Sequence, residues 1–151
     1  MKKRRILVIH GFNSGPGMKN EILAKAFPSD DVICPQLTGH PMRDIDIISE
    51  SLVTPIQYDE TVFVGTSLGG FYAMYMSCFA GGGFSSDNFK IFLINPSFSP
   101  YETLLQYKGQ TLINYKTKLP QEPLTEEDFA HFRTMKDEIV KTFPKVRAEV
   151  N

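Results

Sequence analysis

Ser67 is the residue of this sequence best suited to chemistry. It lies in the pattern Gly65-Thr66-Ser67-Leu68-Gly69, between a short apolar run that predicts a strand and a longer run that predicts a helix. A sharp turn from strand to helix lifts a serine hydroxyl above a sheet, where it can act as a nucleophile. The pattern therefore predicts acyl transfer through Ser67. The alternative is a glycine-rich connection whose serine only caps a helix.

The two glycines of this pattern fit the first interpretation. Gly65 and Gly69 stand two residues to either side of Ser67. A tight strand-to-helix turn crowds these positions, so both must lack a Cβ atom. Such a turn also holds the serine in a strained backbone conformation that costs about 1–3 kcal/mol. The serine then precedes a helix N-terminus, where free backbone amides can stabilise negative charge.

Acyl transfer also needs amide donors for the oxygen that becomes negatively charged. The first expected donor is the amide of Leu68, because the residue after the nucleophile opens the helix. The second is the amide of Phe12, in the loop that follows the first expected strand. Gly11 allows the backbone of that loop to approach closely. We expect His10 to support the loop and not to act as the base.

Two other histidines are candidates for the general base. His40 follows the second expected strand, and loops at the carboxyl ends of parallel strands gather around one crevice. The alternative for His40 is an exposed loop histidine. His131 lies on an amphipathic stretch, where an exposed helical histidine is the favoured interpretation. The acidic residues after Ser67 are interpreted mostly as surface or first-turn charges, and these include Glu122, Glu126, Glu127 and Asp128.

Strand-like and helix-like segments alternate along the chain. Such alternation predicts an α/β fold with a mostly parallel sheet of about four to five strands and helices on both faces. We expect one α/β-hydrolase-like domain over residues 1–151. The expected strands cover residues 5–9, 31–34, 61–64 and 90–95, and the expected helices cover residues 18–27, 43–54, 68–79, 101–107 and 125–143.

The sequence resembles the small bacterial α/β-hydrolase esterases of the YqiA type. The resemblance covers about residues 1–110 and rests on four segments, which are His10 to Ser14, Pro35 to Leu37, Val64 to Ala73, and Asn95-Pro96. It implies an α/β-hydrolase fold and a serine esterase or thioesterase acting on small acyl substrates. It also implies that Ser67 is the nucleophile and that Phe12 and Leu68 frame the oxyanion hole.

The sequence departs from that family after the serine. In the family, an acid and a histidine follow on loops after further strands, whereas this sequence stops where the acid-bearing strand is expected. The resemblance therefore implies a fold truncated at its C-terminal strands and a weak enzyme with an incomplete triad. The alternative is a non-catalytic fold that binds a partner protein or acyl ligand, or half of a split enzyme. An open sheet edge would favour a homodimer or a partner chain.

Composition excludes several other classes of function. A net charge of −1 gives no electrostatic footprint for nucleic acid. No apolar run approaches the length of a membrane span, so we expect a cytoplasmic protein with no membrane contact. Cys34 and Cys78 have no metal-like spacing and are expected to be buried free thiols. The glycine-rich residues 11–17 match no nucleotide-binding motif, and we expect neither a cofactor nor a metal.

Overall fold

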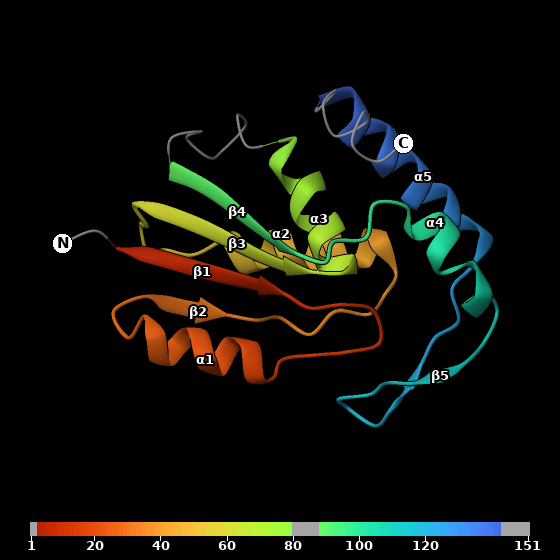
Figure 1. Ribbon diagram of the computed structural model, residues 1–151, viewed down its shortest axis with the longest axis horizontal. Coiled ribbons are helices and arrows are strands. Elements are labelled where there is room, and N and C mark those ends of the chain that lie inside the picture. Colours follow the sequence, from red (N-terminus) through yellow and green to blue (C-terminus); the bar gives the residue numbers. More distant parts are fainter. Residues whose placement is uncertain (1–2, 80–87, 143–151) are drawn as a thin grey trace.

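The centre of the protein is a four-stranded parallel sheet. A computed structural model describes residues 3–79 and 88–142 and gives the strand order β2-β1-β3-β4 (Figure 1). Every neighbouring pair in the sheet is parallel, which confirms the predicted α/β class. The strands are β1 (Arg4–Ile9), β2 (Asp31–Ile33), β3 (Glu60–Thr66) and β4 (Phe89–Ile94).

The two faces of the sheet carry separate apolar clusters. On one face, Leu7 and Phe63 are fully buried and pack with Ile48, Phe71 and Phe132 of three helices. The opposite face carries four smaller aliphatic side chains from the central strands, which are Ile6, Val8, Val62 and Val64. Successive side chains of a strand point to opposite faces, so these continuous apolar runs supply both clusters at once.

Helices cover both faces, as the alternation predicts. The larger cluster lies under α2 (Pro41–Leu52), α3 (Leu68–Ser77) and α5 (Glu126–Thr142). The smaller cluster faces α1 (Met18–Ala26), which lies across the sheet from α3 (Figure 1).

Helix α1 packs less tightly than its sequence suggests. Ile22, Leu23 and Phe27 share one side of the expected helix, yet α1 contains no buried residue. Ile22 is 57% exposed and Phe27 is 41% exposed, and only Leu23 joins the smaller cluster. The main contacts of α1 are with β2, at one edge of the sheet, so part of its apolar side has no surface to cover.

Strand β4 forms the other edge of the sheet. Its side chains alternate between half-buried and exposed, and Phe92 remains 58% exposed on its outward face. Within residues 3–79 and 88–142, no strand pairs with β4 on the side away from β3. An apolar edge strand of six residues is a ready surface for pairing with another strand. Residues 81–88 are low in complexity, which predicts an exposed loop, and they lie outside the described residues except for Asn88.

The chain after β4 forms short elements and one long helix. A short helix is predicted over residues 101–107; the structure has α4 (Pro100–Thr103) and then a 3₁₀ turn, η3 (Leu105–Tyr107). A small antiparallel hairpin of β5 (Leu112–Ile113) and β6 (Pro120–Gln121) follows, and α5 packs on α2, α3 and α4. None of the helices in the described ranges is long and apolar enough to cross a membrane.

Replacing a core residue of α2 should show how far stability depends on the larger cluster. Ile48 is fully buried, so Ile48→Ala leaves a cavity and should lower the free energy of unfolding by about 2–5 kcal/mol. Ile22→Ala is the matched control and should change it by less than about 0.5 kcal/mol. Urea denaturation of both variants measures the difference. Equal losses would contradict the assignment of Ile48 to the core.

Candidate active site

Ser67 occupies a sharp turn between β3 and α3. Strand β3 ends at Thr66, α3 begins at Leu68, and Ser67 between them has φ 54° and ψ −118°. Positive φ is uncommon for a residue with a Cβ atom and stores strain of about 1–3 kcal/mol. The Ser67 residue is exposed to solvent. The turn thus presents one hydroxyl at the carboxyl end of the sheet.

The glycines beside Ser67 are required by close backbone contacts. A Cβ atom on Gly65 would lie 2.4 Å from the carbonyl oxygen of Gly69. A Cβ atom on Gly69 would lie 1.9 Å from the carbonyl oxygen of Ile9. Neither distance is possible for a real side chain, so the two glycines let the turn close against β1.

Backbone hydrogen bonds fix the turn from a second side. The amide of Ser67 donates to the carbonyl of Ile94, at the end of β4, over 3.1 Å. The carbonyl of Ser67 accepts from the amide of Ser97 over 2.9 Å, and also from the first turn of α3. The end of β4, the segment after it and the first turn of α3 therefore hold the strained residue by hydrogen bonds.

The loop after β1 passes directly beside the serine. The position that a Cβ atom of Gly11 would occupy lies 3.4 Å from Ser67 Cβ and 4.0 Å from Ser67 Oγ. Parallel pairing brings this loop there, because Ile9 stands opposite Gly65 in the register of β1 and β3. In the described part of the chain, neither the Phe12 amide nor the Leu68 amide donates a hydrogen bond to a protein group.

His10 connects two loops through both of its ring nitrogens. The Leu37 amide donates to Nε2 over 2.9 Å, so Nδ1 carries the proton and donates to the Gly11 carbonyl over 2.8 Å. Burial is the main effect on this ring and lowers the pKa of His10. The neutral ring supports the loop beside Ser67, as the sequence suggests, and has no free lone pair for proton transfer.

His40 is buried and bonded away from Ser67. Only 6% of the residue is exposed, so it is not the exposed loop histidine that was one interpretation of its sequence position. Its Nδ1 lies 2.8 Å from Asp128 Oδ2, and its Nε2 lies 3.1 Å from the Glu122 carbonyl oxygen. Both partners are acceptors, so His40 ties the start of α2 to the start of α5.

His131 lies on α5 and is partly exposed. Its side chain is 34% exposed, and its Nε2 lies 3.9 Å from Glu127 Oε1, one helical turn away. Among the described residues, no hydrogen bond joins Ser67 Oγ to His10, His40 or His131. The structure thus brings Ser67, Gly11, Phe12 and Leu68 together and does not bond any histidine to the serine.

Asp128 has a structural role that the sequence interpretation missed. It was grouped with solvated first-turn charges, but it is 8% exposed and accepts from the amide of Thr125 over 2.8 Å. The Asp128 amide donates back to Thr125 Oγ1 over 3.2 Å, which completes a reciprocal cap of α5. The spacing Thr125-x-x-Asp128 was the available signal for this cap. Its pairing with His40 had no local signal.

Asp44 is a second buried carboxylate that was not predicted. It is fully buried within α2, and burial is the largest effect that raises its pKa. Its oxygens accept from the amides of Thr38 and Gly39, from the Thr38 hydroxyl and from the Tyr72 hydroxyl over 2.7–2.9 Å. These bonds shape the loop that carries His40 and lower the cost of burying the charge.

No metal centre is evident at these positions. In the part of the chain that the structure describes, no three His, Cys, Asp or Glu side chains are grouped so that they could hold an ion. Cys34 and Cys78 are half-buried free thiols, and burial raises the pKa of Cys34 to about 11. The candidate site therefore consists of a serine hydroxyl and backbone amides.

A family comparison identifies the chain. Residues 5–142 match the model of the uncharacterised protein family UPF0227. The chain belongs to this family. The match confirms the resemblance to small bacterial esterases of the YqiA type that the sequence segments indicate.

The chain is similar to solved structures of a lipolytic enzyme and of an esterase. One comes from work on LipS and LipT, two metagenome-derived lipolytic enzymes, with 20% identity and a TM-score of 0.57. The match covers 96% of this chain and 69% of that one. Another is an inhibited esterase B from Lactobacillus rhamnosis, with 15% identity and a TM-score of 0.49 over 93% of this chain and 48% of that one. The UPF0227 chain thus spans about half the length of esterase B.

The first prediction from the site concerns the contact between Gly69 and β1. Gly69→Ala places a methyl group against the Ile9 carbonyl and should lower the free energy of unfolding by about 3 kcal/mol or more. Gly17→Ala is the control, because its Cβ atom would meet the flexible end of Lys116. Urea denaturation compares the two. A tolerated Gly69→Ala would show that the turn is looser than the structure indicates.

The second prediction separates the two histidines that were candidates for the base. His40→Ala leaves the buried Asp128 without its ring partner and should lower the free energy of unfolding by about 3 kcal/mol. His131→Ala removes only a long contact to an exposed Glu127 and should cost less than about 0.5 kcal/mol. Thermal or urea unfolding provides both values. Similar losses would contradict the structural role of His40.

Proposed function

We propose that this protein is a serine hydrolase that cleaves carboxylic esters or thioesters through an acyl-Ser67 intermediate. The observation that carries the proposal is the positive-φ turn, which presents an exposed hydroxyl between β3 and α3. This is the geometry of a nucleophile elbow. The fold shared with a metagenome-derived lipolytic enzyme supports the same reaction class.

The proposed reaction uses the groups on either side of Ser67. Ser67 Oγ attacks the carbonyl carbon of the substrate, its proton passes to a base, and the carbonyl electron pair moves to oxygen. The amides of Phe12 and Leu68, which donate to no group among residues 3–79 and 88–142, stabilise this oxyanion. Collapse of the intermediate expels the alcohol or thiol with a proton, and water then hydrolyses the acyl-serine. One oxyanion donor contributes about 10²–10³ in rate.

The hydrogen bonds of the histidines bear on which of them could act as the base. His10 would have to lose the bond from the Leu37 amide to its Nε2 before accepting a proton, and both ring nitrogens of His40 are directed at acceptors other than Ser67. His131 keeps a partly exposed ring with one long contact to Glu127, so of His40 and His131 it is the one with fewer bonds to lose. Without a bonded base, oxyanion stabilisation and binding still give about 10³–10⁴ over water, so we propose weak activity.

A second proposal is that another polypeptide completes the site. In the part of the chain that the structure describes, β4 is an edge strand with an exposed Phe92, and it offers a surface for an added strand from a second copy or a partner chain. A strand added there would extend the carboxyl edge of the sheet, where Ser67 lies. Such a partner would supply the base, so this chain would be one half of a split enzyme. Without the partner, the chain would act only as a binding module.

A fluorophosphonate probe tests the activated serine. We expect one adduct per chain at Ser67, located by mass spectrometry, because the turn exposes the hydroxyl beside two amide donors. Ser67→Ala should abolish labelling, and Ser97→Ala should leave it unchanged. His40→Gln and His131→Gln, where folded, show which ring changes the labelling rate. An unlabelled but folded wild-type chain would favour the binding module.

A further inference from the structure

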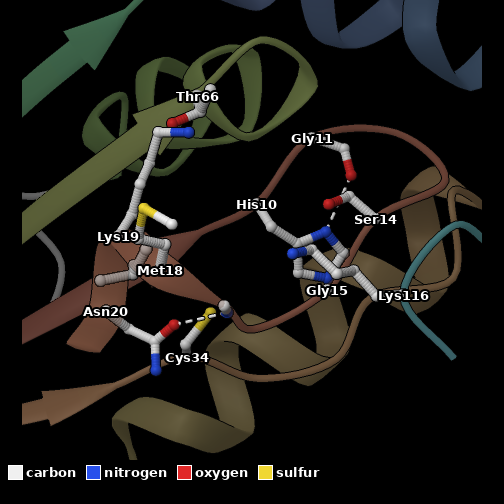
Figure 2. Close-up of a pocket in the computed structure, with 12 residues that line it drawn as sticks. His10, Gly11, Ser14, Gly15, Met18, Lys19, Asn20, Cys34, Thr66 and Lys116 are labelled. Carbon is white, nitrogen blue, oxygen red and sulfur yellow. Dashed lines mark hydrogen bonds between the residues drawn. The ribbon is translucent and has the colours of Figure 1, made fainter. Parts of the chain in front are cut away.

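A cavity lies on the α1 side of the loop that follows β1. It has a volume of about 240 Å³ and is bordered by β1, β3, the start of α1 and the β5–β6 hairpin. Figure 2 shows His10, Gly11 and Thr66 on its wall with Lys19 and Lys116. Neither the reaction proposed above nor the family match assigns a role to this cavity.

The cavity borders the proposed nucleophile. Thr66 and Gly11 both line the cavity, and Thr66 directly precedes Ser67 in the chain. Gly11 also stands beside the serine side chain, since the position that its Cβ atom would occupy lies 4.0 Å from Ser67 Oγ. A substrate whose carbonyl carbon contacts Ser67 can therefore extend another group toward the cavity.

The charged side chains that line the cavity are all positive. Lys19 and Lys116 contribute two ammonium groups, and no Asp or Glu lines the cavity. Among the described residues, neither lysine has a carboxylate partner within ion-pair distance. In Figure 2 the Lys19 side chain extends from α1 in the direction of Thr66. Two unpaired cations beside a hollow form a site that favours an anion.

The Thr66 hydroxyl is a second, independent observation. Its oxygen is buried, lines the cavity and has no hydrogen-bond partner in the described part of the chain. Buried hydroxyl groups normally have a hydrogen-bond partner, so a buried hydroxyl without one needs an explanation. A ligand oxygen in the cavity would accept the Thr66 proton while it binds the lysines.

The hairpin holds Lys116 over the cavity. The Asn114 side-chain amide donates to the Ser14 carbonyl over 3.0 Å, and the Tyr115 backbone amide donates to the Asn13 carbonyl over 3.1 Å. Asn114 Oδ1 in turn accepts from the Lys116 amide over 2.8 Å. Lys116 is therefore positioned by the same loop that carries Gly11, although it is far from Ser67 in sequence.

We propose that this cavity is an anion-binding subsite of the active site. The esters that Ser67 cleaves then carry a carboxylate or phosphate group, which Lys19, Lys116 and the Thr66 hydroxyl bind. The statement about esters rests on the proposed function, whereas the anion-binding property of the cavity does not.

Binding is measured in the Ser67→Ala background, so that no turnover is needed. The probes are monomethyl glutarate, 2-acetoxyethyl phosphate and the neutral dimethyl glutarate, titrated by calorimetry or NMR. We expect at least one anionic ester to bind about tenfold more tightly than the neutral ester, since bonds to charged groups exceed neutral ones. The stronger of the two anionic probes identifies carboxylate or phosphate as the preferred group.

Paired lysine variants show whether the preference arises in this cavity. The double variant Lys19→Met and Lys116→Met should remove the preference, because both lysines line the cavity. The matched double variant Lys25→Met and Lys118→Met should keep it, because neither of these residues does. All four lysines are exposed, so both variants should fold.

Three results would contradict the proposal of an anion-binding subsite. These are equal binding of neutral and anionic esters, no detectable binding of either anion, and a preference that survives the loss of Lys19 and Lys116. If fluorophosphonate labels Ser67 and any of these results is also obtained, the proposed anion-binding subsite is wrong and the proposed hydrolase function stands. If the anions bind in the cavity but Ser67 is not labelled, the hydrolase function is wrong and the cavity remains an anion-binding site.

Discussion

The close contact between the Ser67 turn and the end of β1 is the constraint on which the candidate site depends. A side chain at Gly69 would overlap the Ile9 carbonyl, and Gly11 leaves just enough room for the serine side chain. Parallel pairing of β1 and β3 sets this contact, because it brings the first loop to the end of the strand that carries the serine. The same contact brings the loop of Gly11 and Phe12 beside the serine that precedes Leu68.

Buried polar groups hold the surrounding loops and account for the positions of the histidines. The ring of His10 is hydrogen-bonded to Gly11 and to Leu37, which lie in two different loops. Asp44 accepts a hydrogen bond from the loop before α2, and His40 is bonded to Asp128, which caps α5. Each of these side chains is satisfied by named partners, so they rigidify the loops that they connect. Two of the chain's three histidines, His10 and His40, thus hold loops and helix ends together, and neither is bonded to Ser67 among the described residues.

Structural features that depend on the local spacing of residues could be predicted from the sequence, whereas features that depend on tertiary contacts could not. The parallel strands, the turn at Ser67 and the helix of α5 followed from apolar runs, two glycines and a first-turn acidic cluster. The burial of His40 could not be predicted, because its partner Asp128 lies 88 residues away and looks like any helix-capping acid. The β5–β6 hairpin was missed since two-residue strands have no measurable periodicity, and Lys116 went unnoticed with it.

A crystal structure of the Ser67 phosphonate adduct tests the proposed role of the turn most directly. We expect a phosphorus–oxygen bond to Ser67 Oγ, with the phosphoryl oxygen about 2.7–3.1 Å from the amide nitrogens of both Phe12 and Leu68. The positive φ of Ser67 should be unchanged, because the turn is already held by β1 and β4. An adduct whose phosphoryl oxygen points to solvent, or to neither amide, would contradict the account.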